Sequence, residues 1–119
     1  MTSVLIVDDQ PSFRATLRQL LTQAGLVVVG EACDVPGAEA QAQALHPDLA
    51  IVDIMLPGPN GFEGARRLKA LQPDMRVILV SAFCSFAQNF RNAADEAGAE
   101  KFVLKDDLEL GLVEEWVQK

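Results

Sequence analysis

Short apolar runs rich in β-branched residues alternate five times with longer segments of mixed polarity along this chain. The first run, SVLIVD (3–8), has consecutive apolar residues, which is typical of a strand buried on both faces of a sheet. The next segment, 11–25, instead repeats its apolar residues at helical spacing and ends in a glycine, a common helix stop. Alternation of this kind predicts a parallel sheet covered by helices on both faces.

The rest of the chain continues the alternation without a linker, a repeat or a low-complexity segment. Further strands are predicted over 26–32, 48–56, 76–82 and 101–105. Further helices are predicted over 37–45, 62–72, 85–98 and 107–119, the last one weakened by Gly111. With 119 residues, the chain suits one α/β domain spanning 1–119, with right-handed crossovers between its strands.

Composition and charge narrow the possible partners. Half of the residues are apolar, which is typical of a globular chain, and no apolar run approaches the roughly 20 residues that span a bilayer. The net charge of -7 argues against direct binding to nucleic acid and favours cations or basic protein surfaces. No signal peptide is visible, and Cys33 and Cys84 lack metal-ligand spacing, so we expect free thiols in a reducing cytoplasm.

Polar side chains stand at the carboxyl ends of four of the predicted strands. Asp8 and Asp9 end the first strand, Asp53 lies near the end of the third, Ser81 ends the fourth and Lys105 ends the fifth. Ligands of open parallel sheets bind beyond the carboxyl ends of the strands. If the strand order is 2-1-3-4-5, these four strands are neighbours and their polar groups converge on one rim.

The chemistry of this set predicts a cation site. Carboxylates about 4 Å apart repel by about 4 kcal/mol per pair at an effective dielectric constant of 20, and one lysine does not offset three of them. Mg²⁺ prefers oxygen ligands and binds through one or two carboxylates together with a phosphate. A carboxylate beside Mg²⁺ can also act as a nucleophile and form an aspartyl-phosphate, which Lys105 and Ser81 would stabilise.

Simpler interpretations of these residues exist. Asp8 or Asp9 would suit the N-cap of a helix that starts near Pro11. Lys105 would be an ordinary surface lysine, and the phenylalanines Phe83, Phe86 and Phe90 are expected to be core or partner-facing residues.

Taken together, four motifs in the expected order make the chain resemble a response-regulator receiver domain of bacterial two-component signalling. They are VDD (7–9), VDIMLPGPNG (52–61), VSA (80–82) and FVLK (102–105). The resemblance covers the whole chain. It implies the flavodoxin-like receiver fold with strand order 2-1-3-4-5, and a member of this family is a standard example of that order among doubly wound sheets.

The resemblance implies a metal site and a phosphoacceptor. Asp53 would accept a phosphoryl group from a sensor histidine kinase or a phosphotransfer protein. Asp9, Asp53 and the backbone carbonyl of Met55 would ligate Mg²⁺, and Asp8 would act mainly through water and charge. The kinase is expected to dock on a surface that includes the first helix, from Phe13 to Leu21.

It also implies a switch. Ser81 would move to the phosphoryl group, Lys105 would pair with it, and Phe102 would rotate inward as the aromatic switch residue. That change would reshape the face made by helix four, strand five and helix five, where a homodimer would also form.

Two departures from the common receiver pattern carry further expectations. Asp106 follows Lys105 where many relatives have proline, and LKDD (104–107) favours receivers that carry a LuxR-type helix-turn-helix domain. The expected output is therefore transcription, through a DNA-binding domain that is absent from this chain. Met55 and Phe83 are apolar at positions that flank the path of water to the acyl phosphate, so we expect a phosphorylated form that lasts minutes or more.

Other functions fit less well, and no enzymatic role beyond self-phosphorylation and autodephosphorylation is expected. A stand-alone or phosphorylation-independent docking module would normally lack the acceptor aspartate or the lysine, and both are present. A haloacid-dehalogenase-like phosphatase needs a second acid two residues after its nucleophile, where Met55 stands. A nucleotide-binding domain is disfavoured because GPNGFEG (58–64) does not match G-x-G-x-x-G and no Walker A sequence exists.

Overall fold

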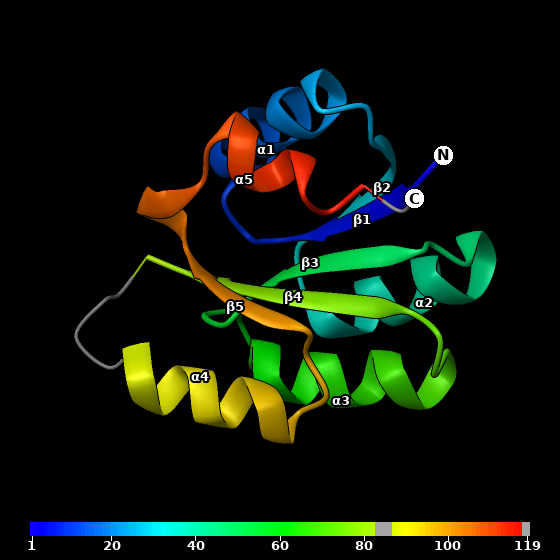
Figure 1. The fold of residues 1–119 in the computed structure, drawn as a ribbon. Coiled ribbons are helices and arrows are strands. Elements are labelled where there is room, and N and C mark those ends of the chain that lie inside the picture. Colours follow the sequence, from blue (N-terminus) through cyan, green and yellow to red (C-terminus); the bar gives the residue numbers. More distant parts are fainter. Residues whose placement is uncertain (83–86, 118–119) are drawn as a thin grey trace.

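A computed structural model describes residues 1–82 and 87–117 as a five-stranded sheet between two layers of helices (Figure 1). All strand pairs are parallel and the order is β2-β1-β3-β4-β5, which confirms the predicted fold and strand order. The strands are β1 Ser3–Val7, β2 Val27–Ala32, β3 Leu49–Asp53, β4 Arg76–Ser81 and β5 Lys101–Leu104.

The helices divide between the two faces of the sheet. Two of them, α1 Pro11–Gln23 and α5 Leu110–Glu114, lie side by side over one face (Figure 1). The other face carries α2 Val35–Leu45, α3 Gly61–Leu71 and α4 Ala87–Glu96. None of the helices in the described ranges is long and apolar enough to cross a membrane.

Alternate residues of the central strands supply two separate cores. Val4 and Ile6 of β1 belong to the core under α1 and α5, which also contains the fully buried Trp116. Leu5 and Val7 belong to the core under α2, α3 and α4. Because side chains alternate along a strand, consecutive apolar residues fill both cores at once, at about 1.5–3 kcal/mol for each large side chain that is fully buried.

Two helices begin earlier than predicted, because a side chain caps each of them. The helix predicted over 37–45 begins at Val35, because the Asp34 carboxylate accepts the backbone N–H of Gly37 at 2.8 Å and caps the earlier start. In α3, the Asn60 side chain accepts the N–H of Glu63 at 3.1 Å, so that helix starts at Gly61. Gly25 has a φ of 92°, which ends α1 where the sequence predicts a stop.

Other boundaries were predicted too long. The strand predicted over 48–56 ends at Asp53, because the chain turns and the Gly61 N–H donates to the Ile54 carbonyl at 2.9 Å. The strand predicted over 101–105 ends at Leu104, since Lys105–Asp107 form a 3₁₀ turn. That turn also delays the last helix, predicted from 107, to Leu110. Cys33 is an exposed free thiol, whereas Phe83, Cys84 and Phe86 lie outside the described residues.

Candidate functional site

The three predicted acids meet at the carboxyl ends of β1 and β3. Asp8 follows the last residue of β1 and is 1% exposed, and Asp53 ends β3 and is 4% exposed. Asp9 is exposed beside them. One carboxylate oxygen from each of the three residues lies within 4.8 Å of the other two.

The Lys105 ammonium lies among these acids. Its Nζ is 2.8 Å from Asp8 Oδ2 and 3.2 Å from Asp53 Oδ2. It also donates to the side-chain carbonyl of Gln10 at 3.5 Å and lies 4.0 Å from the centroid of the Phe13 ring. The sequence motifs identified Lys105 and gave Phe13 only as part of a docking surface; they did not place Gln10 or Phe13 at this site, because neither residue stands at a strand end.

Backbone contacts hold the Asp53 carboxylate in place. The Met55 N–H donates to Asp53 Oδ1 at 3.0 Å. The start of α3 packs directly against the backbone of Asp53: a Cβ on Gly61 would lie 2.3 Å from the Asp53 carbonyl oxygen. Gly61 is therefore required by this site, whereas the sequence indicated only that it belongs to a turn.

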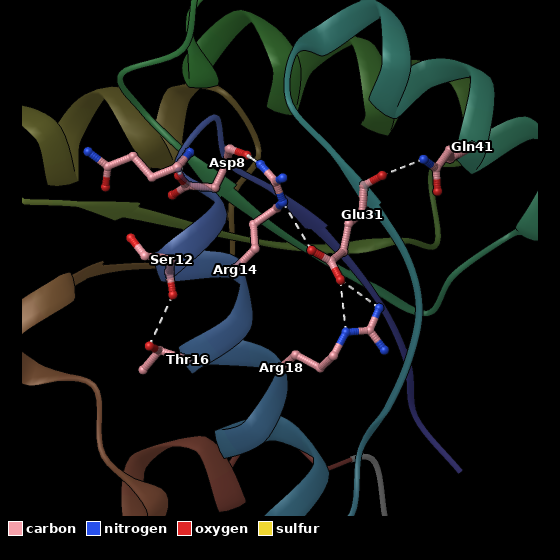
Figure 2. A network of polar contacts seen from close by, with 8 residues as sticks. Asp8, Ser12, Arg14, Thr16, Arg18, Glu31 and Gln41 are labelled. Atoms are coloured by element: carbon pink, nitrogen blue, oxygen red, sulfur yellow. Dashed lines mark hydrogen bonds and ion pairs between the residues drawn. The ribbon is translucent and has the colours of Figure 1, made fainter.

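Hydrogen bonds with residues at the start of α1 hold Asp8 in place. Asp8 Oδ1 accepts the backbone N–H of Gln10 at 2.8 Å, and its carbonyl accepts Arg14 Nη1 at 2.5 Å. Figure 2 shows how Arg14 and Arg18 of α1 both reach Glu31 of β2, at 3.0 Å and 2.7 Å. The residue that precedes α1 is Gln10, so neither Asp8 nor Asp9 is the N-cap of that helix.

Charge in the site is unbalanced, with three carboxylates near one ammonium. Burial raises the pKa of Asp53 above its ordinary value and the nearby Asp8 charge adds to that rise, while the Met55 N–H and Lys105 oppose it. Asp8 Oδ2 is buried and meets no hydrogen-bond donor with good geometry among the described groups, despite its close ion pair with Lys105. Three clustered carboxylates that one ammonium does not offset fit a hard divalent cation.

Asp9 and Asp53 open onto a cleft of about 300 Å³. It is lined by Asp9, Gln10, Asp53, Met55, Ala82 and Lys105. Ser81 is fully buried at the end of β4, the strand that pairs with β3, and is not among the described residues that line the cleft. The structure thus brings Asp9, Asp53, Met55 and Lys105 to the cleft, whereas Asp8 and Ser81 are buried at the ends of their strands.

Phe102 of β5 packs toward α4, on the other face of the sheet from α1. Its half-buried ring meets the Phe90 ring edge-on, with centroids 5.8 Å apart, and the Arg91 guanidinium lies 5.7 Å from it. A hollow of about 540 Å³ lies beside Phe102, between α4 and α5. It is lined by Arg91, Asp95, Lys101, Phe102, Val103, Leu104, Asp107, Glu109 and Leu112.

Comparison with known proteins matches this arrangement to one family. The family model described as "Response regulator receiver domain" matches residues 4–114. The chemotaxis protein CheY of Thermotoga maritima is 34% identical over 102 residues, which are 86% of this chain and 83% of that protein. The transcriptional activator DevR/DosR of Mycobacterium tuberculosis is 38% identical over 107 residues, which are 89% of this chain and 48% of that protein.

A solved structure agrees in fold over the whole chain. It is a response regulator protein from Burkholderia pseudomallei with a phosphorylated aspartic acid, calcium ion and citrate. The TM-score is 0.84 at 25% identity, and the match covers 100% of this chain and 68% of that one. The chain therefore spans most of the CheY relative and about half of the DevR/DosR relative.

Proposed function

Since the chain belongs to the family of response regulator receiver domains, we propose that its Asp53 is a phosphoacceptor for a histidine kinase or a phosphotransfer protein. The observation that carries this proposal is the buried Asp53 carboxylate, with the Asp8 and Asp9 carboxylates and the Lys105 ammonium close to it. Residues 1–119 would form the receiver domain, and it would act in the cytoplasm.

The proposed step is a phosphoryl transfer between two side chains. A carboxylate oxygen of Asp53 attacks the phosphorus of a phosphohistidine, the P–N bond breaks, and its electron pair leaves with the imidazole. Lys105 stands 3.2 Å from Asp53 and would pair with the phosphoryl oxygens as they gain charge. Ser81 would donate a hydrogen bond to the same group from the end of β4.

The donor set also fits a divalent cation, which we propose to be Mg²⁺. Asp9, Asp53 and the Met55 carbonyl would hold it directly, and Asp8 would act mainly through water. One feature supports this: three carboxylate oxygens lie within 4.8 Å of one another, and the single Lys105 ammonium does not offset their charge. When bound, the cation would offset the charge on the carboxylates and on the transferring group.

Mass spectrometry after incubation with acetyl phosphate tests the acceptor. Wild-type protein with Mg²⁺ should gain about 80 Da, one HPO₃ group, and the gain should vanish without Mg²⁺ or in Asp53→Asn. No gain in the wild type, with either acetyl phosphate or a panel of phosphorylated histidine kinases, would support a phosphorylation-independent docking module instead.

Two surfaces are proposed for partners. A groove of about 390 Å³ runs along α1 and opens at Lys105, and the phosphodonor would dock there. It is lined by Ser12, Phe13, Thr16, Leu17, Leu20, Ala82, Lys105, Asp106 and Leu108. The second surface is the hollow between α4 and α5, which is lined by both positively and negatively charged side chains. A second copy of the chain would therefore meet complementary charge there.

Phosphorylation would act on that second surface through Ser81 and Phe102. Light scattering of the phosphorylated and unphosphorylated protein tests the homodimer, which should form only after phosphorylation. Transcription through a DNA-binding domain is the proposed output, supported by the resemblance to DevR/DosR, a DNA-binding transcriptional activator.

The phosphorylated form is proposed to be long-lived. The Met55 side chain is 53% exposed and lines the cleft, where it would hinder the approach of water. Its proposed companion Phe83 lies outside the described residues. Loss of the phosphoryl group should take minutes or more and should be faster in Met55→Asn, as followed by mass spectrometry after removal of the donor.

A further inference from the structure

The contact between Phe13 and Lys105 links the first helix to the candidate site. Phe13 is the third residue of α1, and the ammonium lies 4.0 Å from the centroid of its ring. Cations within about 6 Å of an aromatic centroid are attracted by the negative face of the ring. The Lys105 side chain is only 10% exposed, and water screens such a contact less when the charge is desolvated.

Lys105 needs this support because of its own chemistry. A lysine carries a strongly hydrated charge on a flexible four-carbon stem, so its position is set by its surroundings. Asp8 Oδ2 is nearer to the ammonium than Asp53 Oδ2, at 2.8 Å against 3.2 Å. The carboxylates alone therefore do not favour the position next to Asp53, and a further contact can decide where the ammonium lies.

The Phe13 ring is itself held in place. It packs at the edge of the core that α1 forms with the sheet. Its neighbour Arg14 ties the start of α1 to the Asp8 carbonyl and to Glu31, as Figure 2 shows. These contacts fix the position of the ring relative to Asp8, and the ring in turn restricts where the Lys105 ammonium can lie.

We propose that Phe13 is a positioning residue for the phosphotransfer: its ring holds the Lys105 ammonium beside Asp53 and excludes water from it. The inference rests on the proposed function, because it assigns a partner to one of the residues in that step. Phe13 acts through Lys105 and does not itself touch the reacting atoms. A phenylalanine that served only to dock a kinase would have no effect on a donor too small to dock.

Phosphorylation by acetyl phosphate at saturating Mg²⁺ tests this directly. Phe13→Leu keeps the apolar bulk but removes the aromatic face, and should slow phosphorylation by about three- to tenfold. Phe13→Tyr keeps an aromatic ring, so its phosphorylation rate should stay within about twofold of the wild-type rate. Phe62→Leu is the matched control: Phe62 is also half-buried, stands at the second residue of α3 and does not contact Lys105 in the described structure.

Three results would overturn the inference. They are a wild-type rate in Phe13→Leu, an equal loss in Phe62→Leu, or a failure of Phe13→Tyr to restore the rate although circular dichroism shows it to be folded. A double-variant cycle adds a fourth. In a Lys105→Met background, Phe13→Leu should change the residual rate by less than about twofold, and an undiminished effect there would mean that the ring does not act through Lys105.

Nuclear magnetic resonance separates this inference from the proposed function. Ring current from Phe13 should shift the Lys105 side-chain methylene protons upfield, and the shift should disappear in Phe13→Leu. Absence of the shift overturns the inference even where phosphorylation is normal. If the shift is present but wild-type protein is never phosphorylated, the proposed function fails, and the positioning role fails with it.

Discussion

Charged side chains are paired differently at the two ends of the sheet. Where strands begin, charges are matched: Asp48, just before β3, accepts the N–H and the hydroxyl of Ser3 at 2.9 Å and 3.1 Å. Arg76, the first residue of β4, reaches both oxygens of Glu100 at 2.9 Å and the Trp116 carbonyl at 2.8 Å. Where strands end, three carboxylates cluster and one ammonium pairs with two of them.

The difference indicates which end contributes stability and which end is kept for binding. Charged groups with matched hydrogen bonds add to the free energy of unfolding, whereas clustered like charges subtract from it. An unbalanced cluster persists in a folded chain when a bound ligand compensates it, and the stability that is missing returns on binding. Removing a carboxylate should therefore raise the free energy of unfolding where strands end and lower it where strands begin, and only changes where strands end should respond to Mg²⁺.

The largest effect on stability is expected from Lys105→Met. Removing the ammonium leaves Asp8 and Asp53 buried without a cation, which should lower the free energy of unfolding by about 3 kcal/mol without metal. Urea denaturation in EDTA measures this loss, and Mg²⁺ should restore part of it. Lys101→Met, at the exposed first residue of β5, is the control. A loss as small as that of the control would contradict the buried ion pair.

Asp48→Ala at the other end should cost about 2 kcal/mol, because the partly buried Ser3 loses both of its contacts to the carboxylate. Mg²⁺ should not restore this loss, and phosphorylation of the folded fraction should be unchanged. Asp74→Ala, an exposed acid just before β4, provides the matched control in the same denaturation series. Restoration of Asp48→Ala by Mg²⁺ would argue against the contrast between the two ends.

Asp53→Asn should raise the free energy of unfolding by about 1 kcal/mol in EDTA at neutral pH. The folded pKa of Asp53 is raised, so the ionised form is disfavoured in the fold and costs stability at every pH above its unfolded pKa. The gain should shrink as the pH falls through the folded pKa and disappear below the unfolded one. A variant less stable than wild type at pH 7 would show that Lys105 fully compensates the charge.

The smallest effect concerns the ion pair of Arg76 and Glu100. The Arg76 hydrogen bonds lower the pKa of Glu100 below its ordinary value of 4.5. Their stabilisation is present above the unfolded pKa and is lost as the pH falls through the folded one. Because both side chains are partly exposed, we expect only about 0.5 kcal/mol. Thermal melts of wild type and Glu100→Gln between pH 3 and pH 6 should converge at the acid end and at high salt.

Much of the fold was readable from patterns of consecutive residues. Apolar runs such as 3–8 must be buried on both faces, and that requirement alone favours a parallel sheet between helices. Boundaries were read less well: the last helix starts at Leu110 because the 3₁₀ turn after β5 uses the preceding residues. Such a turn depends on how the chain leaves the sheet, which no local pattern records.

The candidate site divides in the same way. The convergence of Asp8, Asp53 and Lys105 follows from their positions at the carboxyl ends of β1, β3 and β5, because parallel strands end at one rim. The contacts of Gln10 and Phe13 with Lys105 were not predicted, because these residues belong to the loop and the helix after β1 and their approach to Lys105 depends on the packing of α1. Both residues are far from Lys105 in the sequence, so their contacts with it form only in the folded structure and no local pattern predicts them.

The order of apolar runs and polar strand ends, by itself, determined that this chain forms a parallel sheet with an acidic rim. The physical reason is that burial and side-chain alternation act on neighbouring residues and leave a local record. Tertiary structure alone decided that Gly61 packs on the Asp53 carbonyl and that the Phe13 ring faces the Lys105 ammonium. Those contacts join residues from separate elements, so they come into being only when the helices pack on the sheet.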